Sequence, residues 1–116
     1  MNDRKTATRS GRAPDERVVV TGIGVTAPNG VGTEAYWAAT LNGKSGLARI
    51  THLDPERYPT RVAGVVQEFD AAEYVPSRLI VQTDHWTHLG LAATAMALGD
   101  AGVDPAELPE YEMAVV

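Results

Sequence analysis

The only imidazole side chains of this sequence belong to His52, His85 and His88. His85 and His88 are three residues apart in a segment with helical periodicity, so both rings can lie on one side of a helix, a spacing that suits a metal ion. No second pair of ligands follows at a recognisable spacing. The sequence therefore favours a packing or surface role for these histidines, and we expect no metal site and no bound cofactor.

Covalent catalysis would need a nucleophile, and the chain contains no cysteine. The serines are not in a Gly-x-Ser-x-Gly context and are interpreted as loop residues: Ser10, Ser45 and Ser77. Paired carboxylates can do acid–base work, but those near the end of the sequence surround a proline, which is typical of solvated charge: Asp104, Glu107, Glu110 and Glu112. We predict no catalytic residue within these 116 residues.

Gly22 and Gly24 follow an apolar run and, with Ala27, match the degenerate glycine fingerprint of dinucleotide-binding folds. In such a turn a helix begins at the second glycine and points its N-terminus at the pyrophosphate. Pro28 and Asn29 instead predict a loop here. We interpret both glycines as serving a tight exit from a strand rather than a nucleotide site.

The sequence predicts two secondary-structure elements in the first third of the chain, a strand and a helix. The apolar, β-branched run from Val18 to Val25 predicts a strand covered on both faces, as in the interior of an α/β sheet. Thr33 is the predicted N-cap of a helix that continues to about Asn42, with Trp37 and Leu41 on one face. Both tryptophans of the chain are expected to pack in a core or an interface.

A second helix is predicted from an Asp84 N-cap to about Ala101, with Gly102 as its C-terminal stop. It is apolar around most of its circumference, and its small residues allow a neighbouring backbone to approach closely. The remaining segments are predicted as a loop over residues 43–61, a short strand over 62–66, one helical turn over 70–74 and a strand over 113–116.

Length and charge limit the functions open to the chain. Its 116 residues fit a single domain, expected over residues 17–116 after a disordered leader at residues 1–16. The net charge is −5, and residues 1–17 carry five basic against three acidic residues, so the remainder carries −7. Such a body would repel a phosphate backbone, so we expect no nucleic-acid partner. No apolar run is long enough to span a membrane, and we expect a cytoplasmic protein.

The order of several motifs resembles the N-terminus of the β-ketoacyl synthases. The segments that carry this resemblance are Val18 to Gly30, Gly32-Thr33-x-x-Tyr36-Trp37, Leu41 to Gly46, Leu53-Asp54-Pro55-x-x-Tyr58-Pro59 and Ala95 to Asp104. The form Gln82-Thr83-Asp84, together with Tyr58-Pro59, is similar to the chain length factors of bacterial aromatic polyketide synthases, also called ketosynthase β subunits. These resemble a ketosynthase but carry glutamine in place of the nucleophilic cysteine.

The resemblance implies the N-terminal portion of a thiolase-like α/β fold, an incomplete β-α-β layered sheet. It also implies a non-condensing subunit that pairs with a catalytic ketosynthase α subunit, serves an acyl carrier protein and shapes the cavity for the polyketide. The family's nucleophile and histidine pair would lie beyond Val116. Two alternatives stay open: the same portion of a catalytic β-ketoacyl-[acyl carrier protein] synthase, and a small stand-alone binding module.

Overall fold

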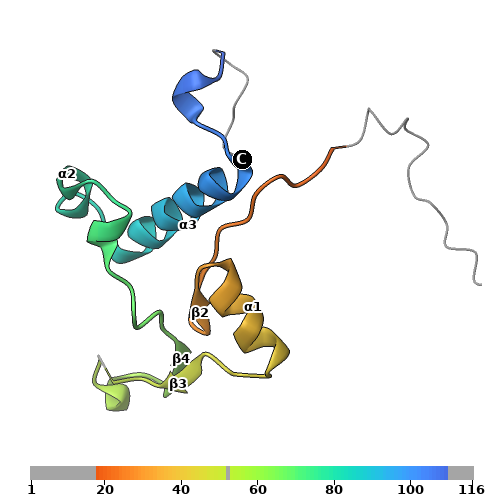
Figure 1. The fold of residues 1–116 in the computed structure, drawn as a ribbon. Coiled ribbons are helices and arrows are strands. Elements are labelled where there is room, and N and C mark those ends of the chain that lie inside the picture. Colours follow the sequence, from red (N-terminus) through yellow and green to blue (C-terminus); the bar gives the residue numbers. More distant parts are fainter. Residues whose placement is uncertain (1–17, 52, 110–116) are drawn as a thin grey trace, which may run out of the picture.

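The computed structural model describes residues 18–51 and 53–109. Figure 1 shows helices α1 (Thr33–Leu41) and α3 (His85–Ala101), with the chain near β1 (Thr26–Ala27) and β2 (Gly30–Val31) between them and a long hairpin at one end. The strands are β1 (Thr26–Ala27), β2 (Gly30–Val31), β3 (Leu47–Arg49) and β4 (Val62–Gly64). The helices are α1 (Thr33–Leu41), α2 (Ser77–Ile80) and α3 (His85–Ala101), with 3₁₀ turns η2 (Pro55–Arg57), η3 (Ala71–Glu73) and η4 (Pro105–Glu107).

Helix α3 confirms the predicted second helix at both ends. The Asp84 carboxylate accepts hydrogen bonds from the backbone N–H of Thr87 at 2.9 Å and from its hydroxyl at 2.7 Å, which caps the N-terminus. At the other end Gly102 has φ of 65°, the left-handed conformation that stops a helix, and the Val103 N–H reaches back to Leu98. Ala92 on this helix is fully buried.

Helix α1 begins where expected, but the prediction for Thr33 was wrong. Gly32, with φ of 85°, occupies the N-cap position, and no side chain caps the helix. The Thr33 hydroxyl instead donates to the carbonyl of Ile23 at 3.0 Å, because the preceding segment lies within its reach. The residue predicted as a cap therefore ties α1 to the chain that comes before it.

The predicted strand at residues 18–25 is not formed in the structure. These residues run without helix or strand until β1 begins at Thr26, and β1 pairs antiparallel with β2 across the Pro28-Asn29 turn. Among residues 18–51 and 53–109, no segment pairs with residues 18–25 as a neighbouring strand, so the ladder that defines a strand is missing. The prediction for residues 113–116 lies outside the described residues.

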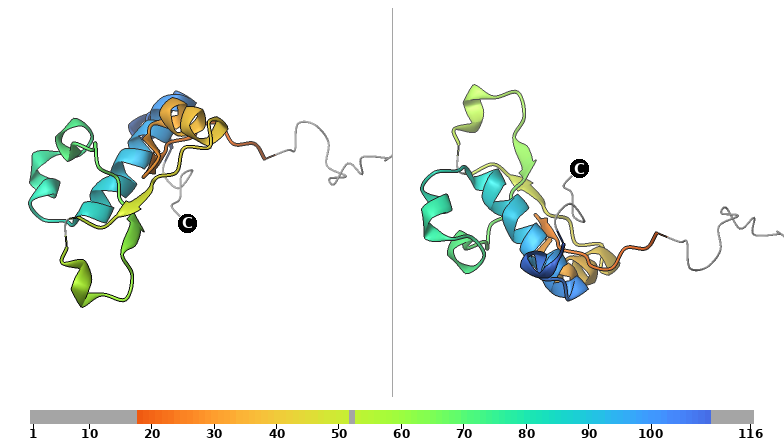
Figure 2. Two further views of the ribbon diagram at one scale, coloured as in Figure 1. Left: turned by 90° about the horizontal axis from the view of Figure 1, so that it is seen from below. Right: turned by 90° about the horizontal axis from the view of Figure 1, so that it is seen from above.

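The interval predicted as a loop over residues 43–61 contains a strand. Leu47–Arg49 pairs antiparallel with Val62–Gly64, so the predicted strand at 62–66 exists in shorter form. A long hairpin loop joins the two strands (Figure 2). It is closed by a hydrogen bond from the Ile50 N–H to the Arg61 carbonyl at 3.0 Å.

Two short turns precede α3. The predicted turn at 70–74 is the 3₁₀ turn η3, capped by the Asp70 carboxylate, which accepts from the Ala72 N–H at 2.9 Å. The next turn, α2, is separate from α3 and begins at Ser77, the residue expected in a loop. Within residues 18–51 and 53–109, no helix is both long and apolar enough to cross a membrane.

The core of the described chain is small. Among the residues whose burial the structure describes, four apolar ones are buried: Ala39, Ile50, Val75 and Ala92. Large apolar side chains stay exposed on several elements, and Trp37 and Trp86 are 57% and 78% exposed. The tryptophans therefore do not pack in a core formed by the described residues, and an interface remains the other predicted role for them.

Candidate functional site

A close contact between two backbone segments lies between residues 22–26 and α3. A Cβ added to Gly22 would lie 2.7 Å from the Ala101 nitrogen, and one added to Gly24 would lie 2.7 Å from the Ala97 nitrogen and 2.9 Å from the Ala93 carbonyl carbon. These positions have no room for a side chain, because backbone atoms of α3 occupy the space. The two glycines therefore bring two backbones together, and no strand precedes them as the strand-exit interpretation required.

Polar contacts extend the same alignment along the helix. The Thr26 hydroxyl donates to the Leu89 carbonyl at 3.2 Å, and the Ile23 N–H donates to the Asp100 carboxylate at 2.9 Å. The segment therefore runs antiparallel to α3, with Gly22 near the C-terminal end of the helix and Thr26 nearer its start. Two residues of extended chain rise by about 6.6 Å and four helical residues by about 6 Å, so the alignment repeats once per helical turn.

The sequence of α3 predicted that another backbone would approach this helix closely, whereas the two glycines were not interpreted in that way. The small residues of α3 predicted that a neighbouring backbone would pack closely there, and that prediction is confirmed by the contacts of Ala93, Ala97 and Ala101. The Gly-x-Gly spacing was the matching signal, since glycines two apart place two missing side chains on one face of an extended chain. The role of Asp100 carried no recognisable signal in the sequence.

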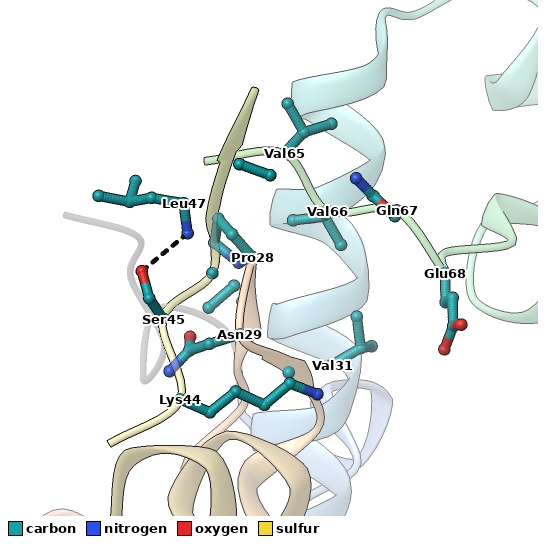
Figure 3. A pocket seen from close by; sticks show the side chains of 14 residues that line it. Pro28, Asn29, Val31, Lys44, Ser45, Leu47, Val65, Val66, Gln67 and Glu68 are labelled. Carbon is teal, nitrogen blue, oxygen red and sulfur yellow. Dashed lines mark hydrogen bonds between the residues drawn. The ribbon is translucent and has the colours of Figure 1, made fainter. Parts of the chain in front are cut away.

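An open cleft of about 300 Å³ lies between the β1–β2 turn, the residues after α1 and the residues after β4 (Figure 3). Its polar lining includes Asn29, Lys44, Ser45 and Glu68. The Ser45 hydroxyl already accepts a hydrogen bond from the Leu47 N–H at 3.1 Å, and none of the described histidines, His85 and His88, lines the cleft. Its described lining thus offers hydrogen-bonding groups and no pair of nucleophile and base of the kind that acyl transfer requires.

The two histidines of α3 occupy different environments. The His85 ring packs edge-on against Phe69, with ring centroids 5.8 Å apart. His88 is buried, with 8% of its surface exposed, and its Nε2 has no hydrogen-bond partner among the described residues. In residues 18–51 and 53–109, no group of three or more potential metal ligands gathers.

Asp84 is the carboxylate whose titration is most clearly perturbed. Hydrogen bonds from the Thr87 hydroxyl and the Thr87 N–H lower the pKa of Asp84 below its ordinary value of 3.8. Both bonds belong to the helix cap, so the lowered pKa reflects the start of α3 and not an acid–base site. The carboxylates Asp104 and Glu107 are exposed at η4, and Glu110 and Glu112 lie outside the described residues.

Comparison with known proteins identifies the architecture to which these elements belong. Residues 15–116 match the family described as "Beta-ketoacyl synthase, N-terminal domain". The "Tetracenomycin polyketide synthase ketoacyl synthase beta subunit" of Streptomyces glaucescens is 54% identical over 99 residues, which are 85% of this chain and 24% of that protein. The "Granaticin polyketide putative beta-ketoacyl synthase 2" of Streptomyces violaceoruber is 50% identical over 105 residues, 89% of this chain and 25% of that protein.

A more distant relative and a solved structure complete the comparison. The "3-oxoacyl-[acyl-carrier-protein] synthase 2" of Vibrio harveyi is 41% identical over 91 residues, 78% of this chain and 22% of that protein. A solved structure, "The ishigamide ketosynthase/chain length factor", is 33% identical with a TM-score of 0.66, over 79% of this chain and 23% of that chain.

These matches confirm the predicted thiolase-like α/β fold as a fragment, with only its small hairpins and helices formed among the described residues. The chain spans about a quarter of the length of the curated relatives that it matches. Over nearly all of its own length, the chain belongs to the β-ketoacyl synthase family as the N-terminal domain of that fold.

Proposed function

We propose that this chain is the N-terminal part of a chain length factor, the non-condensing ketosynthase β subunit of an aromatic polyketide synthase. The observation that carries the proposal is a difference in identity. The chain is 54% identical to a ketosynthase β subunit but 41% identical to a 3-oxoacyl-[acyl-carrier-protein] synthase. A ketosynthase/chain length factor structure is also among its structural neighbours.

In this role the described elements are a scaffold. The packing of residues 22–26 on α3 fixes the position of that helix without using any group that could attack a thioester. The condensation would take place on a ketosynthase α subunit that pairs with the complete β subunit. An acyl carrier protein would deliver the growing chain, and the site of action would be the cytoplasm.

A segment exchange tests which subunit type the chain represents. Residues 17–116 would replace the corresponding segment of the tetracenomycin ketosynthase β subunit, which would then be produced with its α subunit and carrier protein. We expect this chimera to co-purify with the α subunit and to support polyketide formation. The matched control places the same residues in the α subunit, where we expect condensation to be lost.

The alternative that the chain comes from a condensing synthase gives the opposite pattern. In that case the exchange would be tolerated in the α subunit and not in the β subunit. The stand-alone module would be supported by a third pattern, in which neither chimera functions and the 116-residue chain is a stably folded monomer by itself.

A further inference from the structure

Two glycines form a notch at the base of the β3–β4 hairpin. Gly46 comes directly before β3, and Gly64 is the last residue of β4, where it pairs with Leu47. The next pair along the hairpin, Ala48 and Ala63, carries a side chain on both strands. The missing side chains therefore lie at the base of the hairpin, where it joins the rest of the chain.

The ring of Pro28, in the turn between β1 and β2, occupies this notch. A Cβ added to Gly46 would lie 2.7 Å from the Pro28 Cβ, and one added to Gly64 would lie 2.8 Å from the Pro28 Cγ. Carbon atoms in contact are normally about 3.5–4.0 Å apart, so neither glycine has room for a side chain while the ring is present. Figure 3 shows Pro28 beside Leu47 at the cleft.

The turn that carries Pro28 is held in place from its other side. A Cβ added to Gly30 would lie 2.7 Å from the Ala35 carbonyl carbon and 2.8 Å from the Tyr36 Cα, so the backbone of α1 blocks a retreat of the turn. The hydroxyl of Thr26 in β1 is bonded to α3, and the proline ring fixes its own φ. The turn is therefore a fixed support against which the base of the hairpin rests.

We propose that Pro28 is a positioning residue whose ring sets where the β3–β4 hairpin lies and, with it, the width of the cleft. The two walls of the cleft include Pro28 from the turn and Leu47 and Ala48 from the hairpin. Without the ring, the hairpin can rotate about its two connections, residues 42–46 and 65–70. The width of the cleft then changes with it.

A distance measurement between two spin labels tests the proposal on the full 116-residue chain. The chain contains no cysteine, so Arg49→Cys on β3 and Ala95→Cys on α3, both at exposed positions, provide the only two attachment sites. We expect one narrow distance distribution when Pro28 is present. Pro28→Ala should broaden it by about twofold or more, because connections absorb large changes of φ and ψ once their packing is lost. Circular dichroism at 222 nm should stay unchanged.

Alanine at the two glycines separates the effect of the ring from a general loss of stability. The next atoms around a Cβ on Gly64, the Pro28 Cβ at 3.4 Å and the Leu47 Cδ2 at 3.5 Å, lie at ordinary contact distances. Gly64→Ala should therefore broaden the distribution when Pro28 is present and add nothing to Pro28→Ala, which lacks the Cγ. Gly46→Ala is the matched control, because its Cβ would meet the Asn29 nitrogen at 2.5 Å and should broaden the distribution in both backgrounds.

Four results would overturn the proposal. A broad distribution in the chain that keeps Pro28 would show that the hairpin has no fixed position. A distribution unchanged by Pro28→Ala would show that other contacts hold the hairpin. Equal broadening by Gly64→Ala in both backgrounds would show that the ring does not fill the notch. A loss of the signal at 222 nm in Pro28→Ala would assign the residue to the stability of the helices instead.

Discussion

Replacing Gly24 with alanine should destabilise the chain more than any other single methyl addition in residues 22–26. The new Cβ would lie 2.7 Å from the Ala97 nitrogen, whereas an unstrained contact needs 3.5–4.0 Å, so the segment or α3 must move by about 1 Å. The obstructing atoms belong to the backbone and cannot rotate away. Overpacking of this kind destabilises by about 1–3 kcal/mol.

Gly90 and Gly99 offer matched controls for this substitution. Both are helical residues of α3, and a Cβ at either position meets nothing within 4 Å. Alanine there should stabilise the helix by about 0.8–1.0 kcal/mol per site, because alanine loses less backbone entropy than glycine. The same chemical change is therefore expected to have opposite signs at Gly24 and at the two helical sites.

Urea unfolding followed by circular dichroism at 222 nm measures the effect. The background is the chain that carries Gly90→Ala and Gly99→Ala, which raise its stability before Gly24→Ala is added. We expect the two helical substitutions to raise the unfolding midpoint and Gly24→Ala to lower it. A midpoint unchanged by Gly24→Ala would refute the close packing of residues 22–26 on α3.

Three further predictions concern pH, chemistry and stability. The ionised Asp84 carboxylate stabilises the folded chain fully above the unfolded pKa, near the ordinary value of 3.8, and this stabilisation is lost as pH falls through the lower folded pKa. Acid titration followed by the helicity of α3 should show this loss. The variant Asp84→Asn should lack this pH-dependent contribution. The purified chain should accept no radiolabelled acyl group from a carrier-protein thioester, since it has no cysteine to form an acyl intermediate, and a stable acyl adduct would contradict this. The unmodified chain should be marginally stable or prone to aggregate, because its described core is small and Trp37, Leu41 and Val18–Val20 are exposed. Light scattering would detect the association. Reversible unfolding of a monomer with a free energy of unfolding of about 5 kcal/mol or more would overturn the expectation.

Local signals in the sequence predicted the helices well. Asp84 and Gly102 define the ends of α3 through a cap and a left-handed stop, both of which depend on residues next to the helix. Thr33 failed as a cap because its hydroxyl found a partner ten residues earlier in the sequence, at Ile23. Such a contact depends on how two segments pack, which local preference does not contain.

The strands were predicted less well, for a physical reason. An apolar run such as residues 18–25 predicts where a strand can form, but a strand exists only when a neighbour completes its hydrogen bonds. We expected no catalytic or metal site because the residue types that such sites need are missing or isolated in the sequence. For one pair of candidate residues, two glycines, the structure shows a different role. Gly22 and Gly24, weighed first as a nucleotide motif, are packing residues.

The alignment of residues 22–26 along α3 limits how the length of the chain can vary among related proteins. Inserting or deleting one residue in this segment would turn the glycines away from the helix and point bulky side chains at its backbone. The described residues within 51–60, in the hairpin loop between β3 and β4, are exposed, so a change of length there displaces no buried side chain. Length variation should therefore concentrate at residues 51–60 and be absent from residues 22–26.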